Sequence, residues 1–230
     1  MNKTIKILVE ILLAILAVIL VVAIVRSIMK TVQFNKQKAY RESIAIQRLK
    51  DIRTLQVAYK TVNGRFCSTV DSLKTFYETG TMPVVLQVGS QDDSLAMAHT
   101  EALRKANRKI TNEELYQRYL NGDKNLVFSI EHKVNVRDTL FRDRPDLNLD
   151  DLKTIPFSGG TPVDMTAVIK EVSGVQVPLF EAKMPYKELL KGLDNQLRIN
   201  LDADQRDKNR FEGVQVGSIT APNNNAGNWE

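Results

Sequence analysis

Cysteine and histidine are scarce in this sequence, and each shortage narrows the chemistry open to it. A single cysteine, Cys67, excludes an intramolecular disulfide and a multi-cysteine metal site. The two histidines, His99 and His132, lie near no plausible nucleophile in the sequence, so no catalytic triad emerges. We expect Cys67 to act as a small structural hydrophobe and His132 to be a half-buried structural histidine. The sequence therefore predicts no catalytic residue, no metal ligand, no cofactor and a protein that is not an enzyme.

Motifs for phosphate, nucleic acid and calcium are also missing. The loop at 158–162 has neither the spacing nor the lysine of a phosphate-binding loop. Basic residues do not alternate with aromatic ones that could stack on bases, so we expect no nucleic-acid partner. Residues 202–207 are similar to a calcium loop but have no central glycine and no terminal glutamate, which predicts a solvated turn there.

One long apolar run is present, over residues 7–25, and only Glu10 interrupts it. A helix of this length crosses a hydrocarbon core of about 30 Å. The run is longer than a secretory signal core and leads into Arg26 without a small-residue cleavage site, which favours a retained anchor. No second run of spanning length follows. We predict a single-pass membrane protein whose anchor occupies residues 1–33.

The charge around the anchor leaves its orientation open. Residues 26–60 hold nine basic side chains and two acidic ones. Basic residues next to a membrane span stay preferentially in the cytoplasm, and this rule alone would place the body there. Because long domains can translocate regardless of such charges, we expect the bacterial inner membrane with the soluble domain in the periplasm. The basic stretch could attract anionic lipid headgroups or an acidic partner, and the alternative is a solvated helical face.

The sequence after the anchor predicts that the same helix continues as an amphipathic, basic stem over 34–65. Residues 37–62 contain no glycine or proline. Apolar residues recur there at spacings of three and four, at Ala45, Leu49, Ile52, Leu55, Tyr59 and Val62. This face could be buried against the chain's own domain or against neighbouring copies. Asn63 and Gly64 supply the stop.

The remaining residues, 66–230, are expected to form one soluble domain with a flexible C-terminal tail. Alternating or β-rich segments predict strands at 82–88, 126–136, 165–172, 175–184 and 214–216, with a hairpin turn at Ser173 and Gly174. Pro178 restricts its strand to an edge or a bulge. Two helices fit 91–120, the second capped by Thr111 and Glu114. The fold class is α+β: a long transmembrane-plus-stem helix, then a domain with a largely antiparallel sheet.

The first third of the chain resembles type IV pilins and the pseudopilins of type II secretion. Residues 7–13, ILVEILL, resemble the start of the pilin helix, and Tyr59, Gly64 and Phe66 match the Tyr-x-x-x-x-Gly-x-Tyr/Phe element at its end. The resemblance implies that Glu10 pairs with the N-terminal amine of a neighbouring subunit. Thr4, Ile5 and Lys6 stand where a prepilin peptidase site would be, so the resemblance is to an uncleaved, permanently anchored relative.

These observations favour a non-enzymatic scaffolding subunit of a bacterial envelope assembly. Its partners would be other membrane-complex subunits or copies of itself, met through the N-terminal helix, together with membrane lipid. The expected partner-binding residues are Glu10, Lys6, Ile52, Leu55, Tyr59 and Val62, and Glu10 could also pair with Lys6. An accessory subunit of an ion-driven membrane or secretion machine is the first alternative. A membrane-tethered ligand-binding domain or enzyme is the second.

Overall fold

The computed structural model describes residues 3–144 and 146–230, and the chain divides into two compact units. Unit 1 takes the chain up to residue 54, residues 66–71 and residues 148–230. Unit 2 takes 55–65 and 72–147. The sequence predicts one domain over 66–230, and the structure differs because the segment 72–147 packs its apolar side chains together and against residues 55–65, separately from unit 1.

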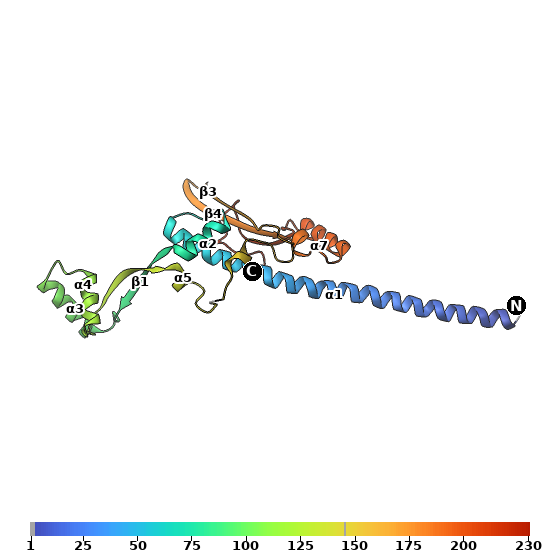
Figure 1. Ribbon diagram of the computed structural model, residues 1–230, viewed down its shortest axis with the longest axis horizontal. Helices are drawn as coiled ribbons and strands as arrows, with labels where there is room; N and C mark the ends of the chain where they lie inside the picture. Colours follow the sequence, from blue (N-terminus) through green and yellow to red (C-terminus); the bar gives the residue numbers. More distant parts are fainter. Residues whose placement is uncertain (1–2, 145) are drawn as a thin grey trace. The chain divides into compact units, whose positions relative to one another are not determined.

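Helix α1 (Lys3–Asn63) is continuous over 61 residues and is drawn in blue in Figure 1. No glycine or proline interrupts it, and at 1.5 Å per residue it is about 90 Å long. It ends at the predicted stop: Gly64 has a φ of 70° and its amide donates to the carbonyl of Lys60 at 2.8 Å. The apolar run and the stem therefore belong to one helix.

Unit 1 contains a three-stranded antiparallel sheet in the order β3–β4–β5. The strands are β3 (Asp164–Val172), β4 (Val175–Pro185) and β5 (Gly213–Gly217). Ser173 and Gly174 join β3 to β4 with φ values of 52° and 80°, the positive angles that a tight hairpin turn requires. The predicted hairpin is confirmed.

The position of Pro178 differs from the edge strand that the sequence predicts. β4 is the central strand of the sheet. However, β5 pairs only with Glu181–Pro185, so at Pro178 the only neighbouring strand is β3, through Ile169. The central strand is thus a local edge at Pro178, where a missing backbone N–H is tolerated.

Three helical segments complete unit 1: η1 (Leu149–Leu152), α6 (Tyr186–Leu189) and α7 (Asn195–Asp207). Helix α7 corrects the prediction of a solvated turn at 202–207. Asp194 caps this helix by accepting a hydrogen bond from the amide of Leu197 at 2.9 Å, and no glycine or proline breaks the segment. The acidic run is therefore helical, with Asp202 buried and Asp204 and Asp207 exposed.

The C-terminal tail is held along β5, where the sequence predicts flexibility. The side-chain amide of Asn228 donates to the carbonyl of Gly213 at 2.8 Å, and its backbone N–H donates to Gln215 at 3.1 Å. The N–H of Gly217 donates to Ala226 at 3.0 Å. These bonds satisfy backbone groups that β5 would otherwise leave open at its outer edge.

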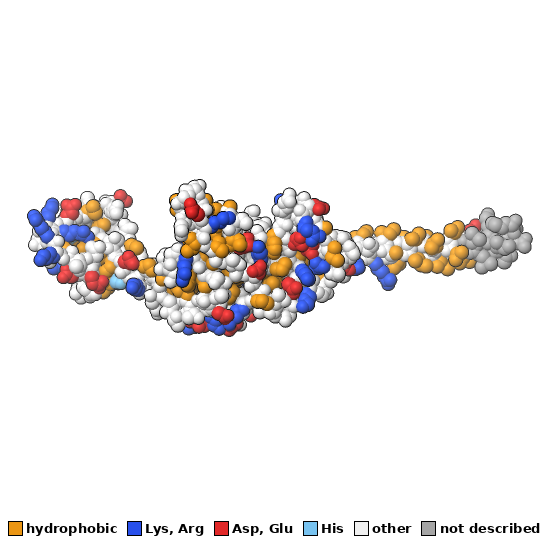
Figure 2. Space-filling model, turned by 90° about the horizontal axis from the view of Figure 1, so that it is seen from above, with side chains coloured by type: hydrophobic (Ala, Val, Ile, Leu, Met, Phe, Trp, Pro, Cys, Tyr) orange, Lys and Arg blue, Asp and Glu red, His pale blue; other side chains and the backbone are white. Residues whose placement is uncertain are grey.

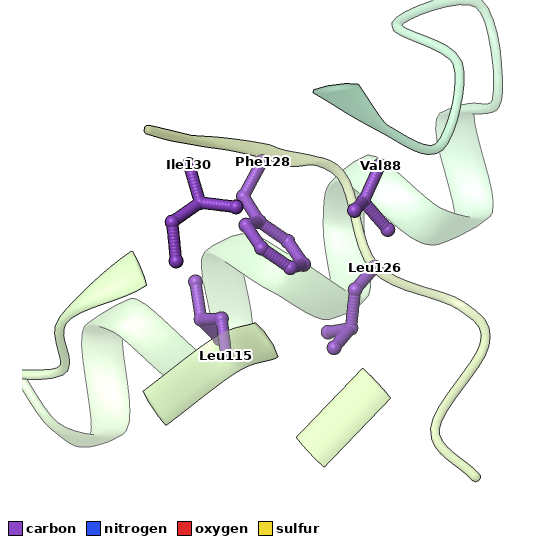
Figure 3. Close-up of a cluster of buried hydrophobic side chains, with 5 residues drawn as sticks. All are labelled: Val88, Leu115, Leu126, Phe128 and Ile130. Atoms are coloured by element: carbon purple, nitrogen blue, oxygen red, sulfur yellow. The ribbon is translucent and has the colours of Figure 1, made fainter. Parts of the chain in front are cut away.

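Unit 2 is built on a two-stranded antiparallel ribbon of β1 (Thr81–Val88) and β2 (Phe128–Asn135). Its helices are α2 (Val70–Thr79), which begins in unit 1, α3 (Ser94–Ala106), α4 (Asn112–Leu120) and α5 (Val136–Thr139). Both strand positions and the predicted capping box of Thr111 and Glu114 are confirmed. One buried cluster, shown in Figure 3, consists of Val88, Leu115, Leu126, Phe128 and Ile130. A second cluster contains Ala58, Phe76 and Val136.

Candidate membrane anchor and partner surface

The N-terminal part of α1 is an uncovered apolar rod. Among the described residues, α1 is the one helix that is long and apolar enough to cross a membrane, and none of its most apolar window is buried. Large apolar side chains from Ile11 to Val32 are exposed all around it, Leu12 by 66%. Figure 2 shows this run of side chains without any covering from the rest of the chain. Such a surface is unfavourable in water and needs lipid or other helices around it.

Charged residues stand at both ends of this apolar rod. Glu10 is exposed at its start, and Lys30 follows 20 positions later on the same helix. At 1.5 Å per residue the two lie about 30 Å apart, which is the thickness of a hydrocarbon core. The predicted contact between Glu10 and Lys6 involves a side chain outside the described part of the chain.

The covered part of α1 begins at Phe34, whose side chain is only 7% exposed. One turn earlier, the ammonium of Lys30 lies 2.6 Å from the carboxylate of Asp194, the cap of α7. Lys30 and the amide of Leu197 hold the pKa of Asp194 below its usual value, because both favour the charged carboxylate. The end of the apolar rod is thereby tied to α7.

Three arginines of the stem, Arg41, Arg48 and Arg53, bind the rest of unit 1; we call them the stem arginines. Arg41 donates to the carbonyls of Leu189 and Lys191 at 3.1 and 2.8 Å. Arg48 donates to Thr154 at 2.9 Å. Arg53 donates to the carbonyl of Asn225 at 3.3 Å and to the carboxylate of Glu230 at 2.6 Å. These basic residues, which the sequence offered for lipid or an acidic partner, serve the chain's own fold.

A buried tyrosine adds a fourth link between the stem and unit 1. The hydroxyl of Tyr186 donates to the carboxylate of Glu42 at 2.6 Å, and the ammonium of Lys38 lies 3.4 Å from the same carboxylate. Burial raises the pKa of Tyr186 well above its usual value, and the charge of Glu42 raises it further. The phenol is therefore held neutral as a hydrogen-bond donor.

The expected partner-binding residues of the stem are divided by the fold. Ile52 and Leu55 are buried within the chain, at 0% and 1% exposure. Tyr59 packs edge-on against Phe76, with ring centroids 5.2 Å apart. Val62 is 40% exposed. Of the two predicted alternatives for the apolar face, burial in the chain's own body therefore accounts for Ile52 and Leu55, and Val62 remains open to a partner.

The scarce reactive residues occupy separate places in the fold. Cys67 is buried, and its thiol donates to the carbonyl of Thr69 at 3.4 Å. In unit 2, His132 stacks near Tyr116 with ring centroids 4.8 Å apart, and His99 lies 3.0 Å from Asp123. Among the described residues, no group of three His, Cys, Asp or Glu side chains gathers closely enough to hold a metal ion.

Several residues that join α1 to unit 1 have sequence signals that were overlooked. Asp194 stands directly before thirteen residues without glycine or proline, which is the pattern of a helix cap. Arg41 and Arg48, seven positions apart, lie on one side of the stem, but nothing in the sequence identifies the carbonyl partners of the stem arginines. Those partners lie more than a hundred positions away in the chain.

Comparison with protein-family models, with curated proteins and with solved structures finds no match to this chain. The resemblance of residues 7–66 to pilins therefore remains a hypothesis. What the molecule does has to be argued from its geometry.

Proposed function

We propose that this chain is a single-pass protein of the bacterial inner membrane that acts as a non-enzymatic structural subunit of an envelope assembly. One observation carries the proposal: a single helix exposes large apolar side chains from Ile11 to Val32, and its buried side chains begin at Phe34. The uncovered part suits lipid and neighbouring helices. The covered part gives unit 1 a fixed attachment to the membrane.

The attachment of unit 1 supports a scaffolding role. The stem arginines and the hydrogen bond from Tyr186 to Glu42 hold the helix to the rest of unit 1. The segments held in this way lie before β3, between β4 and β5, and after β5. A lateral contact made by α1 within the membrane would therefore also position unit 1. Subunits of a membrane assembly need this coupling, and a loosely tethered catalytic domain does not.

Partners would meet the chain through exposed apolar side chains of α1. Within the membrane these are residues such as Leu16, and beyond it Val57 and Val62, which are 46% and 40% exposed. Other subunits of the assembly, or copies of this chain, are the proposed occupants of this surface. The resemblance to uncleaved pilins points in the same direction.

Photo-cross-linking in cells tests the scaffolding role. A photoreactive residue at Leu16 or Val57 should give adducts with a membrane-complex subunit or a second copy of the chain. The same residue at Leu49, which is fully buried, is the matched control and should give none. A chain that yields no adduct and runs as a monomer without partners in mild detergent would contradict the proposal.

Topology is tested with a reporter fused after Glu230. The periplasmic placement predicts activity of a periplasmic reporter and silence of a cytoplasmic one. The reverse pattern would place the body in the cytoplasm and would remove most of the support from the pilin resemblance.

Glu10 separates this proposal from an accessory role in an ion-driven machine. Its exposed carboxylate stands at the start of the apolar rod, where it could face the helices of a channel. For a scaffold, Glu10→Gln should cause loss of complex assembly alone. If the variant instead lost energy coupling while its complex stayed intact, the ion-driven role would replace the scaffold.

A further inference from the structure

Unit 1 has a hollow of about 430 Å³ where α6 leads into α7. Lys187, Lys191 and Arg198 line it, together with one acidic residue, Glu188. Its volume lies within the range of small-molecule sites, which is about 300–1,000 Å³. The lining therefore carries an excess of positive charge.

Part of that positive charge is free to meet a ligand, because Arg198 is paired with Asp202 and Glu188 adds a negative charge. Lys187 is exposed, and no ion pair to it exists among the described residues. Lys191 donates to the carbonyl of Ser158 at 3.0 Å, which leaves its charge uncompensated. Arg198 bonds Asp202 and Asn195 and keeps unused N–H donors of its five. The carboxylate of Glu188 accepts from the hydroxyl of Thr161 at 2.9 Å.

The hollow lies at the end of unit 1 where the apolar rod stops. Asn195 lines it and directly follows Asp194, whose carboxylate binds Lys30 on α1. Lys30 is about 30 Å along the helix from Glu10, so it marks the boundary of a hydrocarbon core. If α1 spans the membrane, the end of the hollow at Asn195 is close to the lipid headgroups, and the end at Lys191 lies beside Arg41, about 17 Å further along α1.

We propose that this hollow binds the phosphate of an anionic phospholipid in the leaflet next to unit 1. Ammonium and guanidinium groups form charge-assisted hydrogen bonds with phosphate oxygens, and basic residues near a membrane attract anionic lipid. The position beside Lys30 favours lipid over free phosphate, although both offer the same chemistry. This inference rests on the proposed membrane anchor.

Native mass spectrometry of the full chain, released from nanodiscs of equal phosphatidylglycerol and phosphatidylcholine, tests it. The wild type should retain more phosphatidylglycerol than phosphatidylcholine. Lys187→Gln should lower the retained phosphatidylglycerol about fivefold, the effect of one basic residue at a membrane surface. Lys109→Gln, an equally exposed lysine in unit 2, is the matched control and should leave the retained lipid unchanged.

Each other result has a defined meaning. Equal retention of the two lipids by the wild type, or equal losses in both variants, would overturn the lipid site while leaving the anchor intact. If inorganic phosphate displaced phosphatidylglycerol and bound at least as tightly as the lipid, free phosphate would be the ligand. The lipid site would then be overturned as well. Failure of the full chain to enter nanodiscs would instead overturn the proposed anchor.

Discussion

The ammonium of Lys30 and the carboxylate of Asp194 lie 2.6 Å apart and join the end of the apolar rod to the N-terminal cap of α7. Asp194 has two tasks at once, because it also accepts a hydrogen bond from the amide of Leu197. One carboxylate thus fixes both a helix end in unit 1 and the place where α1 enters it.

Replacing Asp194 by asparagine tests this pairing, because asparagine keeps the cap but removes the charge. The pKa of Asp194 is lowered, so its stabilising effect is present above the usual value and is lost as the pH falls through the lower folded value. The wild type should therefore melt higher than Asp194→Asn at neutral pH, and the gap should close below about pH 4. Asp204→Asn, in an exposed pair with Lys208, should show little gap. A difference in melting temperature that stayed the same at all pH values would contradict the pairing of Lys30 with Asp194.

Tyr186→Phe removes the hydroxyl that donates to Glu42 and should lower the free energy of unfolding by about 1–2 kcal/mol. The folded pKa of this phenol is raised, so the folded state favours the neutral form. This stabilisation is complete below the unfolded pKa near 10 and is lost progressively as the pH rises above that value toward the folded pKa. The variant should therefore be less sensitive to alkaline pH than the wild type. Denaturant titrations at neutral and alkaline pH measure this. Equal alkaline sensitivity of both proteins would speak against the assignment, and Tyr40→Phe, at an exposed site, is the control.

Leu49→Ala measures how firmly the stem is packed. Its side chain is fully buried, and large-to-small changes at such sites cost about 2–5 kcal/mol. Val57→Ala, at a 46% exposed site on the same helix, should cost less than about 1 kcal/mol. Urea unfolding of the full chain in detergent compares the two. Similar losses would mean that the stem is not covered by its own domain.

Arg53→Gln should loosen the C-terminal tail without unfolding the rest of unit 1. Arg53 contacts Asn225 and Glu230, and an exposed ion pair of this kind adds less than about 1 kcal/mol to global stability. Hydrogen exchange should quicken at the amides of Ala226 and Asn228 and stay unchanged in β4. Lys36→Gln, at an exposed position of the same helix, serves as the control. Unchanged hydrogen exchange in the tail would show that its backbone hydrogen bonds to β5 hold it in place without Arg53.

Local signals predicted most of the regular structure. Neighbouring residues are enough to predict the alternation in β2, the turn at Ser173 and Gly174, and the capping box of Thr111 and Glu114. The continuous α1 follows from the absence of glycine and proline. The prediction of a turn at 202–207 is wrong because closely spaced carboxylates are compatible with a helix when a cap such as Asp194 precedes it.

Long-range relationships could not be predicted in the same way. β1 pairs with β2 across about forty intervening residues, and this pairing makes unit 2 a separate body. Nothing near Arg41 or Arg48 in the sequence reveals that their partners are carbonyls at Leu189 and Thr154. A basic stem can serve lipid, a partner or its own domain, and only the folded contacts distinguish these uses.

The central claim is that α1 crosses a membrane between Glu10 and Lys30 and emerges before Phe34. Spin labels at Val18→Cys and Lys36→Cys, each in a Cys67→Ala background of the full chain in liposomes, test it by power saturation. Both positions are exposed in the folded chain, so burial by protein does not distinguish them. The claim predicts that oxygen dominates the relaxation at Val18 and a water-soluble nickel complex dominates at Lys36. Equal access of the nickel complex to both labels would contradict it.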